Sequence, residues 1–346
     1  MMKSFTENLF ALMLYYSGLI KVIRDKGRPY AKILAFHSVS NDENYFVQGV
    51  TDIWISVALF VEQLSYIRKY YNITSLQGLV ESLQKGEIQE RSVVITFDDG
   101  FADNYHFVYP ILENFRIPAT IFLTTEAIDN RKPIWIQKLN YLINKFGIDK
   151  IVDSMKGLLG DAQFERSISN ADSSHCLHKQ IEQFLAYKVP KEFREEILLK
   201  LYAKFNISLE NIFSQNEIFL SWKTVKKMHG NGICFGNHGE SHTPFAAMSV
   251  DDQRAEIVSS KNMIEKHIKQ DFLPFAYPFG QQRDFARATK RIIDEAGHSC
   301  ILTAMPTLVD VNTSLQELGR IVIGNIPVYR LAYELEKSVL KSWLKL

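Results

Sequence analysis

The strongest constraint on the fold of this chain is a repeated alternation between short apolar runs and longer segments of helical periodicity. Each run is continuously hydrophobic, which is typical of strands buried on both faces of a parallel sheet. The runs occupy residues 32–36, 92–97, 119–124, 233–237, 274–277, 299–303 and 320–323. The segments between them have helical spacing, as at Phe60, Leu64 and Ile67. This alternation favours an α/β barrel or a doubly wound sheet.

Residues 133–220 interrupt this rhythm, because they contain no convincing strand. The stretches "KLNYLINKF", "HKQIEQFLAY" and "EFREEILLKLYAKF" have the pattern of successive helices. A loop of this length is uncommon in a compact domain, so the segment should have structure of its own. We therefore expect a helical insertion between two strands of a domain that spans residues 30–330. We expect it to cover or border the functional site and to influence specificity.

Both ends of the chain are predicted to be helical, over residues 1–29 and 331–346. The longest uncharged run near the N-terminus, residues 8–20, is too short to cross a bilayer, which takes roughly 20 residues. It also lacks the basic start and small-residue cleavage site of a signal peptide. We interpret residues 1–29 as an amphipathic helix docked on the body. The alternative is peripheral membrane contact through an apolar stripe of Phe5, Leu9, Leu12, Tyr16, Leu19 and Ile23.

Charge and cysteine content narrow the partners and the compartment. A formal net charge of +1 provides no global field to attract nucleic acid. The three cysteines are too few and too scattered for a disulfide framework or a cysteine-rich zinc site. These observations predict no nucleic-acid partner and a cytoplasmic location, with membrane-peripheral attachment as an option.

Two aspartates, Asp98 and Asp99, end the apolar run at residues 92–97 and are followed by Gly100. Ligands of α/β folds bind at the carboxyl ends of the strands. Taken alone, such a pair more often marks a strand-to-helix turn with a capping aspartate. Adjacent carboxylates also repel each other unless a cation offsets their charge.

A second apolar run, residues 233–237, is followed by His238 and His242. Imidazoles four residues apart on one helical face can bind one metal ion, although the spacing is common and weak by itself. Together with Asp99 they make a His₂Asp set of the kind found in catalytic metal sites with open positions. A metal held by Asp99 would offset the repulsion and leave Asp98 free to act as a base.

A third run continues into "FAYPFGQQRDF", where Pro278 and Gly280 predict a sharp turn. Tyr277 and Phe279 beside this turn would suit the wall of a sugar site. They are equally consistent with core aromatic residues next to a turn.

Several of these motifs together resemble the polysaccharide deacetylase superfamily, carbohydrate esterase family four, also called the NodB-homology domain. The resemblance rests on "TFDDGFADNY", "PILENFRIPATIFLTT" and "NHGESH", with support from "LAFHSVS", "FAYPFG", "AGHSCILTAMPTLV" and "LGRIVI". It covers about residues 30–130 and 218–325. It implies a distorted (β/α)7-type barrel and metal-dependent removal of an acyl group, usually N-acetyl, from an amino sugar.

Carried over by position, the resemblance implies that Asp98 is the general base and that Asp99, His238 and His242 bind one divalent metal ion. Zinc is the expected ion, because two imidazoles and a carboxylate suit it. The backbone N–H of Phe279 is implied as an oxyanion donor.

This chain differs from the family pattern at three places, where a residue with a usual role is missing. Gly239 stands where a serine or threonine is usual. Ala276 stands where many members have an arginine that orients the base, so Arg283 or Arg320 is expected to substitute. No Leu-x-His follows near the C-terminus to supply the general acid. His37 is the candidate for that role, against the alternative that it is a structural histidine bonded to a nearby carbonyl. The histidines at 106, 175, 178, 229 and 267 are assigned no role.

The favoured function is therefore metal-dependent deacetylation of an N-acetylated sugar or glycan, such as a surface-polysaccharide or lipid-linked intermediate. Two alternatives stay open: hydrolysis of a non-sugar amide on the same scaffold, and glycan binding without catalysis. The sequence does not indicate which sugar or acyl group is involved, or the oligomeric state.

Overall fold

A computed structural model describes residues 2–25, 30–41, 53–159, 162–169, 171–210, 212 and 217–344. Residues 1, 26–29, 345 and 346 of the predicted terminal helices, and a few positions of the predicted insertion, lie outside this described part. All seven predicted strand regions are strands: β1 (Ala31–Phe36), β5 (Ser92–Phe97), β6 (Ala119–Leu123), β7 (Cys234–Asn237), β8 (Phe275–Ala276), β9 (Ile301–Leu302) and β10 (Arg320–Val322). The short strands β2 (Ser38–Val39), β3 (Trp54–Ile55) and β4 (Asn72–Ile73) were not expected from the sequence.

The main sheet is parallel throughout and curls into a nearly closed barrel. Its strand order is β10-β1-β5-β6-β7-β8-β9, with β4 paired to β5. A parallel bridge between Leu302 in β9 and Leu318, just before β10, brings the two edges together. The predicted distorted (β/α)7-type barrel is thus confirmed. Parallel order places the carboxyl ends of β1, β5, β7 and β8 at one rim, where the candidate site residues that follow these strands lie. Arg320 is the first residue of β10 and lies one strand over, beside β1.

The strands are buried on both faces, as their continuous hydrophobicity predicts. Every residue of β1, β5 and β6 is buried. Phe36, Phe60 and Phe97 form one aromatic cluster between the sheet and its covering helix. Gly236 in β7 leaves room for the Phe122 ring, since a Cβ there would approach the ring carbons to 2.4 Å.

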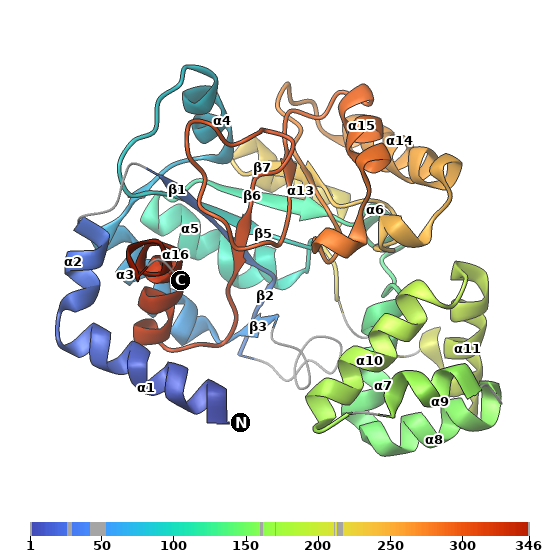
Figure 1. The fold of residues 1–346 in the computed structure, drawn as a ribbon. Helices are drawn as coiled ribbons and strands as arrows, with labels where there is room; N and C mark the ends of the chain where they lie inside the picture. Colours follow the sequence, from blue (N-terminus) through green and yellow to red (C-terminus); the bar gives the residue numbers. More distant parts are fainter. Residues whose placement is uncertain are drawn as a thin grey trace.

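Helices cover the outside of the barrel and form a lobe beside it (Figure 1). The covering helices are α3 (Val57–Tyr70), α4 (Leu76–Gln84), α5 (Tyr109–Phe115), α6 (Thr125–Asn130), α13 (Trp222–Gly230), α14 (Val250–His267) and α15 (Arg287–Glu295). The lobe between β6 and β7 contains α7 (Trp135–Phe146), α8 (Ile148–Leu159), α9 (Ala162–Ile168), α10 (Ser174–Tyr187) and α11 (Lys191–Lys204). This is the helical insertion that the sequence predicts.

The N-terminal segment differs from the expected single helix. It forms α1 (Met2–Tyr16) and α2 (Leu19–Asp25), separated at Gly18, whose φ of +77° ends the first helix. Both pack beside α16 (Val328–Leu344), where Arg330 pairs with Glu7 at 3.0 Å.

The predicted stripe of six apolar residues is divided between two helices, because Leu9, Leu12 and Tyr16 belong to α1 whereas Leu19 and Ile23 belong to α2. The sixth residue, Phe5, lies outside the described side chains. Ile23 is buried, whereas Leu9, Tyr16 and Leu19 are exposed. Within the described residues, no helix is both long and apolar enough to cross a membrane.

Candidate active site at the carboxyl rim of the barrel

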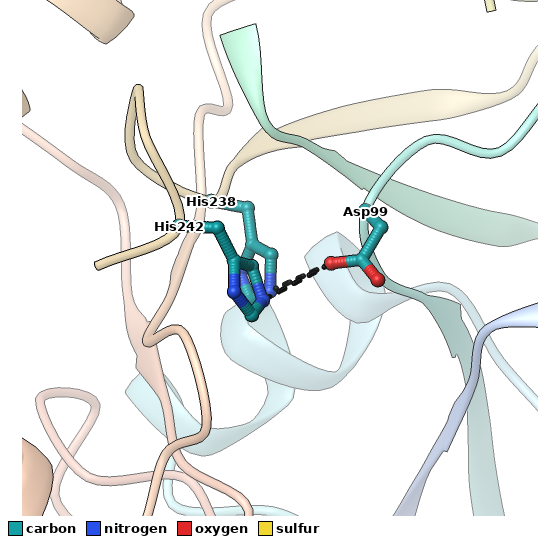
Figure 2. Close-up of side chains that lie close together, drawn as sticks. All are labelled: Asp99, His238 and His242. Atoms are coloured by element: carbon teal, nitrogen blue, oxygen red, sulfur yellow. Dashed lines mark ion pairs between the residues drawn. The ribbon is translucent and has the colours of Figure 1, made fainter. Parts of the chain in front are cut away.

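Asp99, His238 and His242 lie together at the rim (Figure 2). The Nε2 atoms of His238 and His242 are 3.5 Å and 3.2 Å from Asp99 Oδ1. One potential ligand atom from each residue lies within 4.8 Å of the others, and all three side chains are buried. The expected grouping of these residues is therefore present in the tertiary structure.

The histidine pair reaches this position from a loop, not from the helical face that the four-residue spacing suggested. Residues 238–244 follow β7 without helical structure. Glu256 of α14 holds the loop, because its Oε1 accepts hydrogen bonds from the backbone N–H groups of Glu240 (2.9 Å) and Ser241 (2.6 Å). The loop thus turns both imidazoles toward Asp99.

Three site residues have left-handed backbone conformations, which are rare and strained outside glycine. They are Asp99 (φ +69°), His242 (φ +55°) and Phe279 (φ +61°). Each directly or closely follows a buried strand that constrains it. Strain of this kind at three converging residues is typical of a functional site.

The hydrogen bonds and donor atoms of the cluster fit a bound cation. His238 Nδ1 donates to the Ala276 carbonyl at 2.8 Å, which leaves the Nε2 lone pair facing Asp99. Burial lowers the pKa of His238 to about 4, so its imidazole is neutral. Burial opposes ionisation of Asp99, but the His242 imidazole beside it outweighs this effect and lowers the pKa. Asp99 Oδ1 is also buried without accepting a hydrogen bond. Burial opposes protonation of His242, but the Asp99 carboxylate outweighs it and raises the pKa of His242. Once His242 gives up that proton, two imidazole nitrogens and a carboxylate oxygen are suitable zinc ligands.

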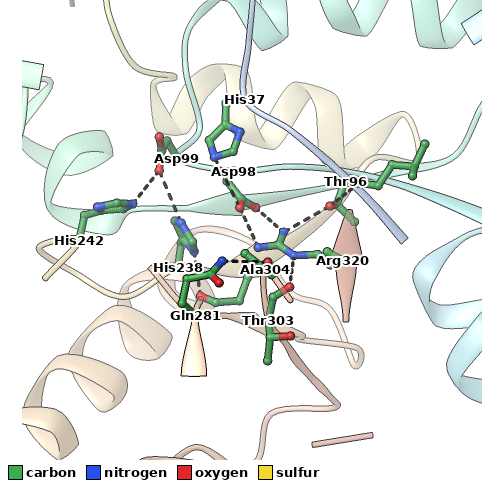
Figure 3. A network of polar contacts seen from close by, with 12 residues as sticks. His37, Thr96, Asp98, Asp99, His238, His242, Gln281, Thr303, Ala304 and Arg320 are labelled. Atoms are coloured by element: carbon green, nitrogen blue, oxygen red, sulfur yellow. Dashed lines mark hydrogen bonds and ion pairs between the residues drawn. The ribbon is translucent and has the colours of Figure 1, made fainter. Parts of the chain in front are cut away.

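Asp98 forms a buried, two-pronged pair with Arg320 of β10 (Figure 3). Arg320 donates from Nη1 to Asp98 Oδ1 at 2.6 Å and from Nη2 to Asp98 Oδ2 at 2.8 Å, and its Nε donates to the Thr303 carbonyl at 3.1 Å. Burial would raise the pKa of Asp98, but the Arg320 charge overcomes it and holds the pKa below its usual range.

Of the two arginines that the sequence offered for orienting Asp98, the structure places only Arg320 against it. Arg283 is exposed on the loop after β8, and its Nε lies 3.7 Å from Oδ1 of the neighbouring Asp284. The expectation for Arg283 is corrected, because the turn at Gly280 directs the following residues toward the helical insertion.

His37 follows β1 and faces Asp98 across the rim, with 3.9 Å between His37 Nε2 and Asp98 Oδ2. Its Nδ1 is buried and has no hydrogen-bond partner among the described residues, so this atom does not make the carbonyl bond of the structural-histidine alternative there. Its backbone carbonyl accepts a hydrogen bond from Asn104 Nδ2 at 2.9 Å. His37 is thus fixed through its backbone while its ring borders the cavity.

The aromatic residues of the third rim segment have different environments. The Phe279 ring lies 5.0 Å from His242 and borders the cavity. Tyr277 is buried and its ring stacks on Phe285 at 4.0 Å, so it belongs largely to the core even though it reaches the cavity wall. Pro278 is buried, and its carbonyl accepts from Gly280 N–H at 2.7 Å in the tight turn.

Hydrogen bonds from other residues stabilise the loop at Gly239, where the usual serine or threonine hydroxyl is missing. Asn237 Oδ1 accepts a hydrogen bond from Gly239 N–H at 2.8 Å, and Asn237 Nδ2 lies 3.1 Å from His298 Nε2. His298 Nδ1 is 3.1 Å from the Ile293 carbonyl, which assigns the proton to Nδ1 and the acceptor role to Nε2. This chain, together with Glu256, steadies the loop in place of a hydroxyl on residue 239.

The helical insertion forms the opposite wall of the site, with residues that sequence reasoning left without a role. A cavity of about 290 Å³ above Asp99 is bordered by α7 and α10, including Asn140, His178 and Glu182. Burial raises the pKa of Glu182 to about 7. Trp135, the first residue of α7, donates from Nε1 to the His242 carbonyl at 3.2 Å. No motif in the sequence marks these residues, because their role depends on how the lobe folds back onto the barrel.

The chain is similar in sequence to known polysaccharide deacetylases. A sequence model described as polysaccharide deacetylase matches residues 85–156 and 189–301, more than half of the chain. The chain is 26% identical over 186 residues to a poly-beta-1,6-N-acetyl-D-glucosamine N-deacetylase of Staphylococcus epidermidis, covering 51% of this chain and 58% of that protein. A Staphylococcus aureus protein of the same name is 33% identical over 72 residues, covering 20% and 25%. The chain thus matches from a quarter to somewhat over half the length of these relatives.

Solved structures also share the fold, among them the two that follow. The Streptococcus pyogenes deacetylase PplD, solved in complex with acetate, has a TM-score of 0.56 and 19% identity, covering 88% of this chain and 97% of that one. IcaB from Ammonifex degensii has a TM-score of 0.54 and 16% identity, covering 90% of this chain and 97% of that one.

Proposed function

Because the chain belongs to the polysaccharide deacetylase family, we propose that it is a metal-dependent hydrolase that removes an N-acetyl group from a carbohydrate. The observation that carries the proposal is the convergence of Asp99, His238 and His242 beside the Asp98–Arg320 pair. A metal set can polarise an unactivated amide, and a separate ionised carboxylate can take a proton from the attacking water.

Asp99, His238 and His242 would hold one divalent ion, with zinc expected from the donor set. When bound, the ion supplies Lewis acidity, which favours both the attacking water and the developing negative charge. His238 is already oriented for this role by its hydrogen bond to the Ala276 carbonyl.

The chain's own residues then handle the protons. Asp98, kept ionised and oriented by Arg320, accepts a proton from the water that adds to the acyl carbon. The C–N bond breaks as the leaving nitrogen receives a proton from His37, whose Nε2 faces the same space. The backbone N–H of Phe279 donates to the oxygen of the tetrahedral intermediate. The products are a carboxylic acid, acetate for an N-acetyl group, and a free amine.

We propose an N-acetylated amino sugar or a glycan that contains one as the substrate, supported by the names of the staphylococcal relatives. A cytoplasmic, membrane-peripheral location stays a prediction. Its support is a set of exposed apolar side chains on α1 and α2, namely Leu9, Phe10, Met13, Tyr16, Leu19 and Val22. Cell fractionation, and sedimentation of the protein with phospholipid vesicles, would test it.

The proposed activity is tested by measuring acetate release from N-acetylglucosamine and its oligomers, with the metal content determined on the same samples. Asp98→Asn should lower kcat by about 100-fold or more while metal stays bound. His238→Ala should lose the metal. Asp294→Asn, at an exposed position on α15, is the matched control and should behave like the wild type.

Each alternative has its own outcome. Full metal occupancy without acyl release from any sugar would favour a glycan-binding protein. Release confined to non-sugar amides would favour the second enzyme hypothesis. Undiminished turnover in Asp98→Asn would remove that residue as the base.

A further inference from the structure

The two imidazoles of the candidate metal set are oriented in different ways. His238 Nδ1 donates to the Ala276 carbonyl at 2.8 Å, and this bond fixes the ring. His242 Nδ1 is buried and has no hydrogen-bond partner among the described residues. Metal-binding imidazoles almost always donate their second N–H to an acceptor that sets the orientation of the ring. The orientation of His242 therefore depends on packing and on how its backbone, in the left-handed region at φ +55°, is held.

Two side chains of the helical insertion hold the backbone at His242. Trp135, the first residue of α7, donates from Nε1 to the His242 carbonyl at 3.2 Å. Arg194 of α11 donates from Nη2 to the hydroxyl group of the next residue, Thr243, at 2.8 Å. The Arg194 guanidinium also lies 4.4 Å from the Trp135 ring centroid, so the cation packs on the ring that binds His242. The lobe thus contacts this strained segment at two successive residues.

Arg194 is a buried cation whose polar partners, among the described residues, are neutral. Its side chain is 1% exposed. It donates to the Thr243 hydroxyl and to the Leu185 carbonyl at 3.4 Å, and its Nε has no partner in this part of the chain. Burial lowers the pKa of Arg194 to about 10, so the side chain stays charged at neutral pH. Because burying an unpaired charge costs stability, packing alone would favour an apolar residue at this position.

The contact at Thr243 continues through the loop to a carboxylate on the opposite side. Ser241 Oγ lies 2.9 Å from both Thr243 Oγ1 and Glu256 Oε1. Two hydroxyl groups of the loop therefore join the Arg194 cation on the lobe to the Glu256 anion on α14. Hydrogen bonds to charged groups are stronger than those between neutral groups, so both ends of this chain hold the loop firmly.

Trp135 and Arg194 lie behind the site. The cavity of about 290 Å³ above Asp99 is bordered by His242 and Phe279 but, within the part of the chain that the structure describes, by neither Trp135 nor Arg194. Any effect of these two side chains on a ligand in the cavity must therefore pass through the loop that contains His242.

We propose that Arg194 is a positioning residue for His242: by packing on Trp135 and binding Thr243, it fixes the loop that presents this imidazole to the metal. The helical insertion is then a part of the metal site as well as a wall of the cavity. This inference rests on the proposed metal-dependent function.

The test measures zinc affinity of the full chain by equilibrium titration against a competing chelator. Arg194→Met should lower the affinity by about 10–100-fold, the usual effect of losing support behind a metal ligand. Thr243→Val removes the acceptor but keeps the side-chain shape, so it tests the same bond if Arg194→Met folds poorly, and it should lower the affinity by about tenfold. Lys200→Met removes an exposed cation from the same helix as the matched control and should keep the wild-type affinity.

A further variant separates positioning from a general loss of stability. Met155→Ala removes a buried side chain from α8, which packs inside the lobe, and should lower the urea midpoint while leaving zinc affinity unchanged. Wild-type affinity in both Arg194→Met and Thr243→Val overturns the proposal. So does a loss of affinity in Met155→Ala as large as that in Arg194→Met.

Hydrogen exchange of the metal-free protein separates failure of this inference from failure of the proposed function. Arg194→Met should speed amide exchange in residues 239–243 by about tenfold or more, whereas Lys200→Met should not. Unchanged exchange in these residues overturns the positioning role even if the protein is a metal-dependent deacetylase. Faster exchange in Arg194→Met, when the wild type binds no zinc, supports the positioning role and rejects the metal-dependent function.

Discussion

The buried pair between Asp98 and Arg320 allows the sharpest test of how this site is built. Asp98 is 4% exposed and Arg320 is 1% exposed, so neither charge is solvated once its partner is removed. Losing one partner of a buried pair typically destabilises a protein by about 3–5 kcal/mol. Arg320→Met also removes the hydrogen bond to the Thr303 carbonyl, worth about 1 kcal/mol. We therefore expect Arg320→Met to lower the free energy of unfolding by about 4–6 kcal/mol.

A double-mutant cycle isolates the pair from these other contacts. Adding Asp98→Asn to Arg320→Met neutralises the unpaired carboxylate. The double variant should therefore lose about 2–3 kcal/mol less unfolding free energy than the two single variants lose together. The assay is urea unfolding followed by circular dichroism, with a chelator present so that metal binding does not add to stability.

Two further variants sharpen the cycle. Arg320→Lys keeps the charge but loses the two-pronged geometry, so its stability should be intermediate and measurable even if the methionine variant folds poorly. Arg291→Met removes an exposed arginine whose ion pair with Glu295 spans 3.5 Å, and should change stability by less than about 0.5 kcal/mol. Additive losses in the cycle would refute the claim that the pair is an energetically coupled unit.

Three other perturbations follow from the site. His37→Ala should lower kcat by about 100-fold or more with little change in metal content, and an unchanged kcat would exclude His37 as the acid. Glu256→Gln weakens the hold on the histidine loop and should reduce metal affinity by about 10–100-fold in equilibrium titrations, whereas Glu265→Gln on the exposed face of the same helix should not. Burial lowers the pKa of His298 to about 4 from 6.5, so its contribution to stability is complete above pH 6.5 and is lost as the pH falls toward 4. When the pH is lowered from 7 to 4.5, the unfolding free energy should therefore fall by about 2–3 kcal/mol less in His298→Gln than in the wild type. Identical pH dependence of the two proteins would contradict this.

Much of the fold could be predicted from local sequence alone. Strands such as residues 92–97 are continuously apolar because both of their faces are buried, and burial acts on each residue of the run. Asp98, Asp99 and His238 could be recognised for a related reason. Ionisable side chains directly after buried strands lie at the rim where parallel strands end, and their chemical types limit what they can do there.

Other features depend on contacts between residues far apart in the chain, for which the sequence contains no local pattern. Arg320, more than two hundred residues from Asp98, could not be preferred over Arg283 until β10 was placed beside β1. Glu256 and Glu182 look like ordinary polar positions on helices, yet one holds the histidine loop and the other borders the cavity. The sequence by itself determined the strands, the rim and the chemical types of the candidate metal ligands, because each of these can be recognised from residues that are adjacent in the chain. Only the tertiary structure decided which groups orient, support and enclose that set, because a pair of distant side chains acquires a role only when packing brings them together.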